Sequence, residues 1–365
     1  MAEPVLGFLR LARTQSVGPV TYRRLLARFP SPEEALAALP ALAKSGGRAT
    51  PPRIPPMAEI EREYLAVSRM GGVFLFLDQP GYPDYLAELP DAPPAIAVLG
   101  DADLLAARSI GIVGARNASA NGMRLAAHLA AELAPRLIVV SGLARGIDTA
   151  AHEGALRGGR TIAVIAGGLD MPYPEDNADL QRRIAENGAV VAEAPLGTAP
   201  IGRHFPKRNR IIAGLTLGLV VLEAATRSGS LLTARLAAEA GREIFAVPGS
   251  PLDPRARGGN DLIRQGAHLT ETADDVLANL PARPLARGFA EPPPLWEETP
   301  TPDTDLSRAR REIPALLSPE PVGVDEIARR CQLSLTAIRA VILELELAGR
   351  VESLAGDRVA LPEDP

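Results

Sequence analysis

The densest group of positive charge in the sequence lies at residues 203–210, which read Arg-His-Phe-Pro-Lys-Arg-Asn-Arg and include no acid. Guanidinium groups make planar, bidentate contacts to phosphate, and an aromatic ring offers a face on which a nucleobase can stack. Most charged runs are simply solvated surfaces, but the ring inside this run favours a site for a phosphodiester strand. The candidate contacts are Arg203, Phe205, Lys207, Arg208, Asn209 and Arg210.

Four glycine-rich loops could bind the phosphates themselves, at residues 113–119, 141–148, 167–170 and 227–231. Glycine lets the backbone approach a ligand closely, and a helix that begins in such a loop adds the positive end of its dipole. For any single loop, tight packing is an equally good explanation. Four of them on one edge of a fold favour an anion site. The candidate residues are Arg116, Ser141, Gly142, Arg145, Gly146, Ser228, Gly229 and Ser230.

The elements that must position these loops alternate between apolar strands and amphipathic helices over residues 72–280. The predicted strands are Ser109–Val113, Leu137–Val140, Thr161–Ile165, Ala189–Ala192, Leu217–Leu222 and Glu243–Val247. The predicted helices between them include Asn121–Leu133, Thr149–Arg157, Asn177–Asn187 and Ser230–Ala240. This alternation is typical of an α/β fold with a Rossmann-like, doubly wound parallel sheet, which binds its ligands beyond the carboxyl ends of the strands.

Three further regions flank this core. Residues 1–71 have leucines at helical spacing and a helix start at Ser31-Pro32-Glu33-Glu34, so we expect a helical domain there. Residues 281–304 form a predicted acidic, Pro-rich linker that contains Trp296. Residues 305–365 predict helices at Leu306–Leu317, Val324–Arg330 and Ser334–Ala348 and a hairpin at 351–361, which is the pattern of a winged-helix domain.

The bulk composition limits the classes of function. The net charge is -5, so any attraction for a polyanion must come from a local cluster. Cys331 is the only cysteine, which excludes a disulfide framework within the chain. The N-terminus carries charges too early for a signal peptide, and no apolar run is long enough to span a membrane. We therefore expect a cytoplasmic protein with no membrane partner.

In chain order, the motifs VGAR, SGLARGIDTAAH, AGGLDMPYPEDN, HFPKRNRIIAGL, SGSLLTA, AVPGS and GGNDLIRQGA closely resemble those of the DNA-processing protein A family, also called DprA or Smf. The resemblance covers residues 75–275 and implies a SAM-like helical N-domain and a winged-helix C-domain. It also implies a non-enzymatic homodimer that binds and protects single-stranded DNA during natural transformation and loads the recombinase RecA onto it. By the same resemblance, Arg116 contacts DNA and Phe205 lines a base pocket. Many members have a lysine where this chain has Gly202.

Other functions have weaker support in the sequence. A nucleotide-binding enzyme of the phosphoribohydrolase type is the main alternative, but position 235 is Arg where those enzymes have an acid. Asp148 and His152 could share a helix face as metal ligands, yet two candidates without a third are usually structural, so we expect no metal and no cofactor. A winged-helix reader of duplex DNA is disfavoured because residues 305–365 carry a net charge of -3.

Overall fold

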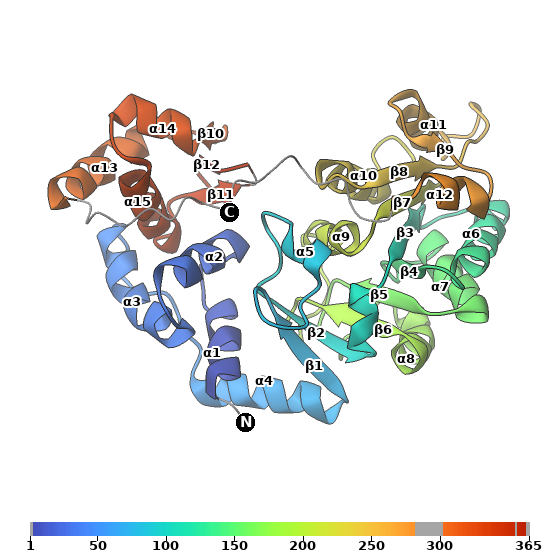
Figure 1. Ribbon diagram of the computed structural model, residues 1–365, viewed down its shortest axis with the longest axis horizontal. Coiled ribbons are helices and arrows are strands. Elements are labelled where there is room, and N and C mark those ends of the chain that lie inside the picture. Colours follow the sequence, from blue (N-terminus) through green and yellow to red (C-terminus); the bar gives the residue numbers. More distant parts are fainter. Residues whose placement is uncertain (1–2, 282–301, 355, 363–365) are drawn as a thin grey trace. The chain divides into compact units, whose positions relative to one another are not determined.

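The computed structural model describes residues 3–281, 302–354 and 356–362 of the chain (Figure 1). They divide into two compact units. The larger unit contains Glu63–Leu89 and the central region that begins at Ala95, and the smaller one contains the N-terminal helices together with the C-terminal domain. The predicted linker at 281–304, with Trp296, lies outside the described residues except at its two ends.

The larger unit is built on a nine-stranded sheet in the order β1-β2-β6-β5-β4-β3-β7-β8-β9. From β6 to β9 every neighbouring pair is parallel, whereas β1 and β2 add an antiparallel edge beside β6. The strands are β1 Gly72–Phe76, β2 Ala95–Gly100, β3 Ser109–Gly114, β4 Ile138–Ser141, β5 Thr161–Ile165, β6 Ala189–Ala192, β7 Gly218–Leu222, β8 Glu243–Ala246 and β9 His268–Leu269.

Helices cover both faces of this sheet (Figure 1). Ile110 and Ile112 of β3 belong to the core formed with α6 and α7. Gly111, between them, faces Ile212 of α9 on the opposite side. The helices of this unit are α4 Met57–Arg69 from Glu63 onwards, α5 Asp84–Ala87, α6 Ala120–Leu133, α7 Ile147–Gly158, α8 Ala178–Asn187, α9 His204–Leu215, α10 Gly229–Glu239, α11 Arg257–Arg264 and α12 Ala273–Asn279. The expected doubly wound α/β class is therefore confirmed.

The six predicted strands and the four predicted helices all exist, with ends that differ by at most two residues. Strands β1, β2 and β9 were not predicted, because β1 and β2 are antiparallel additions to the alternating pattern and β9 has only two residues. The basic run forms the first two turns of α9, with Arg203 as the N-cap residue.

The smaller unit contains the predicted N-terminal helices and the winged-helix domain. The N-terminal helices are α1 Glu3–Ala12, α2 Pro19–Arg28 and α3 Pro32–Ser45. Ser31 caps α3 by accepting a hydrogen bond from the Glu34 backbone N–H at 3.2 Å, as predicted. The C-terminal elements are α13 Asp303–Leu316, β10 Val322–Gly323, α14 Val324–Cys331, α15 Leu335–Leu347, β11 Glu352–Leu354 and β12 Arg358–Ala360. Cys331 is buried at the end of α14.

Helix α15, which holds the position of a recognition helix, packs against α3 within this unit. The approach is close, because a Cβ added at Gly46 would lie 2.0 Å from the backbone oxygen of Glu344. Arg48 donates a hydrogen bond of 3.0 Å to the Leu347 carbonyl, and Arg24 lies 3.6 Å from the Glu346 carboxylate. The N-terminal helices therefore occupy part of the surface of α15.

Candidate functional site

The candidate site lies at the carboxyl ends of β3, β4, β5 and β7. Between β3 and β7 the order in which strands are added to the sheet reverses. Strands β3 to β6 are added on one side and β7 to β9 on the other, so β3 and β7 are neighbours that end together at Gly114 and Leu222. Loops that leave such a switch point diverge and leave room for a ligand. Helix α9 crosses from β6 back to β7 and begins at this same edge.

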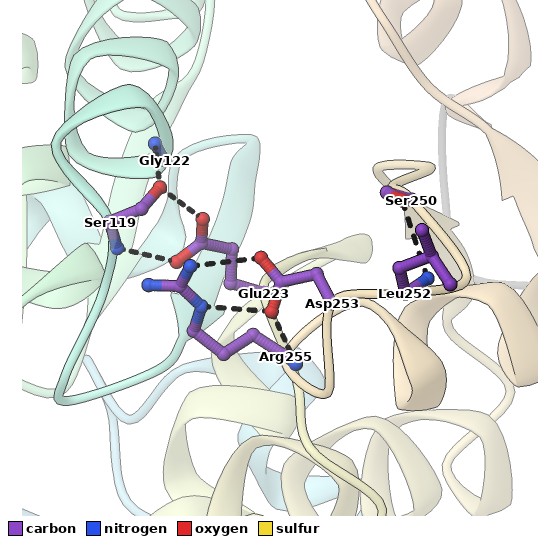
Figure 2. Close-up of polar contacts among 7 residues, drawn as sticks. All are labelled: Ser119, Gly122, Glu223, Ser250, Leu252, Asp253 and Arg255. Atoms are coloured by element: carbon purple, nitrogen blue, oxygen red, sulfur yellow. Dashed lines mark hydrogen bonds and ion pairs between the residues drawn. The ribbon is translucent and has the colours of Figure 1, made fainter.

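The loop after β3, which carries Arg116, is fixed by an acid from the loop after β7. The Glu223 carboxylate accepts a hydrogen bond of 2.8 Å from the Ser119 backbone N–H and a second, shorter one from the Ser119 hydroxyl. Ser119 in turn caps α6 by accepting from the Gly122 N–H at 2.9 Å. Figure 2 shows Glu223 between Ser119 and the Arg255–Asp253 ion pair. The two loops are therefore linked at the switch point.

The loop after β4 has most of its predicted site residues inside the protein. Ser141 is buried, and its hydroxyl donates to the Ile112 carbonyl at 2.6 Å. A Cβ at Gly142 would lie 1.8 Å from Nη1 of Arg208. Gly146 has a φ of +80° and lies against the backbone of residues 115 and 116, so only glycine suits it. These contacts give both glycines a packing role, which was the alternative explanation of the glycine-rich turns.

Arg208 is also buried, beneath this loop. Its Nη1 donates a hydrogen bond of 2.7 Å to the Val164 carbonyl of β5. Burial lowers the pKa of Arg208 to about 10, although the nearby Asp148 opposes the change. Burial raises the pKa of Asp148 above its usual value. The charge of Arg208 and the hydrogen bonds that Asp148 accepts from the Gly142 and Ala144 N–H groups oppose this change. Arg208 and Asp148 thus both lie buried under the loop.

His152, on the next turn of α7, completes this buried group. Its Nδ1 lies 2.7 Å from the Thr161 hydroxyl, which itself donates to the Val139 carbonyl, so Nδ1 must be the protonated nitrogen. Burial, with a smaller effect of Arg208, lowers the pKa of His152 to about 3. The ring is therefore neutral at physiological pH and holds β4, β5 and α7 together.

Asn209 and Arg210 are buried as well and bond to neighbouring elements. The Asn209 amide donates to the Gly229 carbonyl at 3.4 Å, and Arg210 forms an ion pair of 2.6 Å with Glu193. The second half of the basic run therefore faces the protein interior. The sequence could not show this, because it depends on which face of α9 packs against the sheet.

Four other predicted cations are exposed at this edge: Arg116, Arg145, Arg203 and Lys207. Arg145 forms an exposed ion pair of 3.0 Å with Asp176. The guanidinium carbon of Arg116 lies 4.7 Å from the ring centre of Phe205, which is a cation–π contact between the β3 loop and the start of α9. The structure thus brings together the two residues to which the sequence assigned DNA contact and base stacking.

Tyr173, which the sequence analysis did not select, lies beside Phe205. The two ring centres are 5.7 Å apart and the rings are tilted by 58°. The tyrosine comes from the loop after β5, within the motif Met-Pro-Tyr-Pro at 171–174. An aromatic residue in a glycine-rich loop at the carboxyl end of a strand was the signal that could have identified it.

The start of α10 provides the remaining part of the site. The Ser228 and Ser230 hydroxyl oxygens lie 2.9 Å apart, and a Cβ added at Gly229 would meet no atom within 4 Å. Gly229 is thus the predicted loop glycine that is open to an approaching ligand, at the positive end of a helix. On the second turn of this helix, Arg235 forms an exposed ion pair with Glu239 at 2.9 Å.

Three family models match the chain. Residues 73–281 match the model described as DNA recombination-mediator protein A. Residues 3–66 match a DprA-like N-terminal HHH domain, and residues 297–357 match a DprA winged helix domain. The first of these models covers more than half of the chain and contains every candidate residue of the site.

Known proteins similar to this chain have related names. The DNA processing protein DprA of Streptococcus pneumoniae is 48% identical over 198 residues, which are 54% of this chain and 70% of that protein. Its X-ray structure matches with a TM-score of 0.60 at 42% identity, over 63% of this chain and 80% of that one. A Helicobacter pylori structure, titled for the unique single-stranded DNA binding mode of DNA processing protein A, matches with a TM-score of 0.52 at 30% identity, over 57% and 95%. Among the described residues, no helix is both long and apolar enough to cross a membrane.

Proposed function

Because this chain belongs to the DNA recombination-mediator protein A family, we propose that it binds single-stranded DNA at the carboxyl edge of its sheet and catalyses no reaction on it. The observation that carries this proposal is the contact of Arg116 with Phe205, 4.7 Å apart, beside the open start of α10. A cation for phosphate and a partly exposed ring for a base are the two groups that an unpaired strand requires. The Helicobacter pylori structure, which is described by its single-stranded DNA binding mode, supports the same assignment.

In this proposal the predicted site residues have two different tasks. Arg116, Arg203 and Lys207 are exposed and contact phosphates, whereas the exposed Arg145 must first leave Asp176. Gly229 and Ser230 present the first N–H groups of α10 to one phosphate, and Ser228 stands before them as the N-cap residue. The buried residues shape these loops from beneath: Ser141, Gly142, Arg208, Asn209 and Arg210. The half-buried Gly146 does the same by packing against the backbone of the β3 loop.

The preference for a single strand follows from the same geometry. A duplex keeps its bases stacked inside and presents no free face to Phe205, whereas an unpaired base can leave its stack. The net charge of -5 also gives no general attraction for DNA, so the local cluster must provide the affinity.

A binding comparison tests this function directly. Fluorescence anisotropy would be measured with a labelled oligothymidine and with a duplex of equal length, each at several salt concentrations. We expect tighter binding of the single strand, with little dependence on base sequence. Equal or tighter binding of the duplex would overturn the proposal.

We further propose, from the family resemblance, that the protein is a cytoplasmic homodimer that protects incoming DNA in natural transformation and loads RecA onto it. The dimer is tested by sedimentation equilibrium. Loading is tested by the time at which RecA begins to hydrolyse ATP on a strand already covered by single-strand-binding protein. If the protein loads RecA, that delay becomes shorter, and an unchanged delay would contradict the proposal.

The alternative function, a phosphoribohydrolase, lacks support because the acid of that enzyme motif is missing from this chain. Helix α10 has Arg235 at the position where the motif of those enzymes has its acid, and this arginine is exposed and bound to Glu239. Incubation with a nucleoside monophosphate should therefore release no free base. Release of the base at a rate proportional to protein concentration would show that this alternative is correct.

A further inference from the structure

Helix α6 has a negative charge at its N-terminus that its own first turn does not supply. The N-terminus of a helix is the positive end of its dipole, and a carboxylate or a phosphate stabilises it. The first turn of α6 contains no acid. Glu223, just after β7, accepts hydrogen bonds there from the Ser119 backbone N–H at 2.8 Å and from the Ser119 hydroxyl. Its carboxylate is therefore an internal anion at the start of α6 (Figure 2).

The Glu223 carboxylate lies very close to the helix. A Cβ added at Gly122, in the first turn of α6, would lie 2.6 Å from the carboxylate carbon and 2.7 and 2.9 Å from the two oxygens. Glu223 also has a φ of +46°, a left-handed conformation that residues other than glycine adopt at a cost. A residue kept in such a conformation at the switch point of the sheet indicates that the position of its side chain is used.

The start of α10, on the same edge of the sheet, differs from the start of α6. Its N-cap residue, Ser228, makes no capping hydrogen bond with its side chain, and its first turn contains no acid. A Cβ added at Gly229 would meet no atom within 4 Å. Of these two helix starts, which follow the neighbouring strands β3 and β7, one is filled by a side chain of the protein and the other is open.

The filled position is the one where a doubly wound sheet usually binds the phosphate of a nucleotide. In such sheets the loop after the first parallel strand leads into a helix whose N-terminus receives the phosphate. Here that strand is β3 and that helix is α6. A phosphate at this place would have to displace Glu223 from Ser119 or lie beside it as a second negative charge, and both cost free energy.

We propose that Glu223 is a specificity-determining residue that excludes the phosphate of free nucleotides from the start of α6. The carboxylate does so by occupying the hydrogen-bond donors of Ser119 that a phosphate would use. A phosphate at this edge is then left with the open start of α10. The inference concerns a ligand that the protein rejects, so its test does not depend on DNA binding.

The test uses the full chain with adenosine monophosphate, and with adenosine as the ligand that lacks the phosphate. Glu223→Gly removes the side chain, and glycine suits the positive φ. Glu223→Asn is a second open variant, because asparagine tolerates this φ and is one methylene too short to reach Ser119. Glu223→Gln keeps the length and an oxygen that accepts from the Ser119 N–H. Glu239→Ala is the matched control, since it removes one exposed carboxylate from α10.

Hydrogen exchange of residues 117–123, measured by mass spectrometry, locates the binding, and calorimetry gives its strength. Circular dichroism first shows that each variant is folded. In the two open variants this segment should exchange faster, because the Ser119 N–H loses its acceptor. Adenosine monophosphate should slow that exchange again and bind at least about tenfold more tightly than to the wild type, the effect of one charge-assisted hydrogen bond. Adenosine should do neither.

In the wild type, in Glu223→Gln and in Glu239→Ala, adenosine monophosphate should leave the exchange of this segment unchanged. Slower exchange in the wild type would overturn the proposal without the use of any variant. So would open variants that gain no protection from the nucleotide, or a Glu223→Gln that behaves like Glu223→Gly, since the amide would then fail to occupy the site. Binding of oligothymidine is measured separately, so the proposed function and the role of Glu223 can fail independently.

Discussion

Arg116 and Arg208 lie near the same loops but in different surroundings, and this difference decides what each can do. Arg116 is exposed, and its guanidinium lies over the face of the Phe205 ring. Arg208 is buried, bound to the Val164 carbonyl and close to Asp148. A buried cation without its partner is costly, so Arg208 is committed to the interior. Only the exposed arginine can exchange its contact for a phosphate.

Arg116→Ala should therefore weaken binding of single-stranded DNA and reduce its salt dependence. Loss of one phosphate contact should lower the slope of log K against log salt by about 0.7–1. Anisotropy titrations over a range of salt concentrations measure both effects. Arg136→Ala is the matched control, because Arg136 is exposed and precedes β4, at the opposite edge of the sheet. An unchanged slope for Arg116→Ala would place the phosphate contacts elsewhere.

Gly142→Ala should destabilise the protein. The added Cβ would lie 1.8 Å from Nη1 of Arg208, so the buried guanidinium or the loop must move. Overpacking of this kind costs about 1–3 kcal/mol, measured as a lower urea midpoint at unchanged slope. Gly202→Ala is the comparison, because no atom lies within 4 Å of a Cβ at Gly202, and it should leave the midpoint where it was. Equal midpoints for both variants would contradict the packing role of Gly142.

His152 should make stability depend on pH. Its pKa is about 3 in the folded protein against 6.5 in a model peptide, so only the unfolded chain gains a proton between these values. The contribution is complete above pH 6.5 and is lost as the pH falls towards 3. Between pH 7 and pH 5 it should lower the free energy of unfolding by about 2 kcal/mol.

The variant His152→Gln cannot titrate and isolates this contribution. Urea unfolding at pH 7 and pH 5 should show a smaller loss of stability in the variant than in the wild type. Asp148, whose raised pKa acts in the opposite direction, is present in both proteins and largely cancels from the difference. The same pH dependence in both proteins would mean that His152 is not buried in its neutral form.

At the scale of elements, α9 and α15 show how the surroundings of a helix decide its role. Helix α9 begins at the carboxyl edge of the sheet and buries its residues from Arg208 onwards, so only its first turn reaches solvent. Helix α15 has the sequence position of a recognition helix, yet eight of its thirteen residues are buried. Part of that burial comes from α3, in contact through Gly46.

Gly46→Leu should separate α15 from α3, because even a Cβ at this position would lie 2.0 Å from the Glu344 backbone oxygen. We expect faster hydrogen exchange of the α15 amides, measured by mass spectrometry. Affinity for a single strand should not change, since the proposed site lies on other elements. Gly18→Ala is the control in the same unit, because no atom lies within 4 Å of a Cβ at Gly18. Unchanged exchange in Gly46→Leu would show that α3 does not protect α15.

At the scale of the whole molecule, the chain is acidic, and its C-terminal domain is acidic as well. The chain carries a net charge of -5, and residues 305–365 have eight arginines and no lysine against eleven acids. Several of those arginines pair with acids of the same domain, such as Arg310 with the buried Glu344 at 2.7 Å. The C-terminal domain is thus poorly suited to a polyanion.

Deleting residues 305–365 should therefore leave the affinity for single-stranded DNA within about twofold of its original value, because this acidic domain provides no electrostatic attraction for DNA. The truncated chain loses the partner of α3, so circular dichroism and size-exclusion chromatography must first show that it is folded and not aggregated. Loss of binding in a folded truncated protein would place DNA contacts in the winged-helix domain.

The sequence by itself determined the class of the fold, six of the nine strands of the central sheet with the helices between them, and the edge at which the loops gather. It could do so because hydrophobic periodicity and turn chemistry are local, and parallel strands always end on the same side. Only the tertiary structure decided that Arg208, Asn209 and Arg210 are buried while Arg116 and Phe205 meet, and that Tyr173 joins them. It also separated Gly142 and Gly146, which pack against protein atoms, from Gly229, which is open. These outcomes depend on contacts between segments far apart in the chain, and local sequence does not specify such contacts.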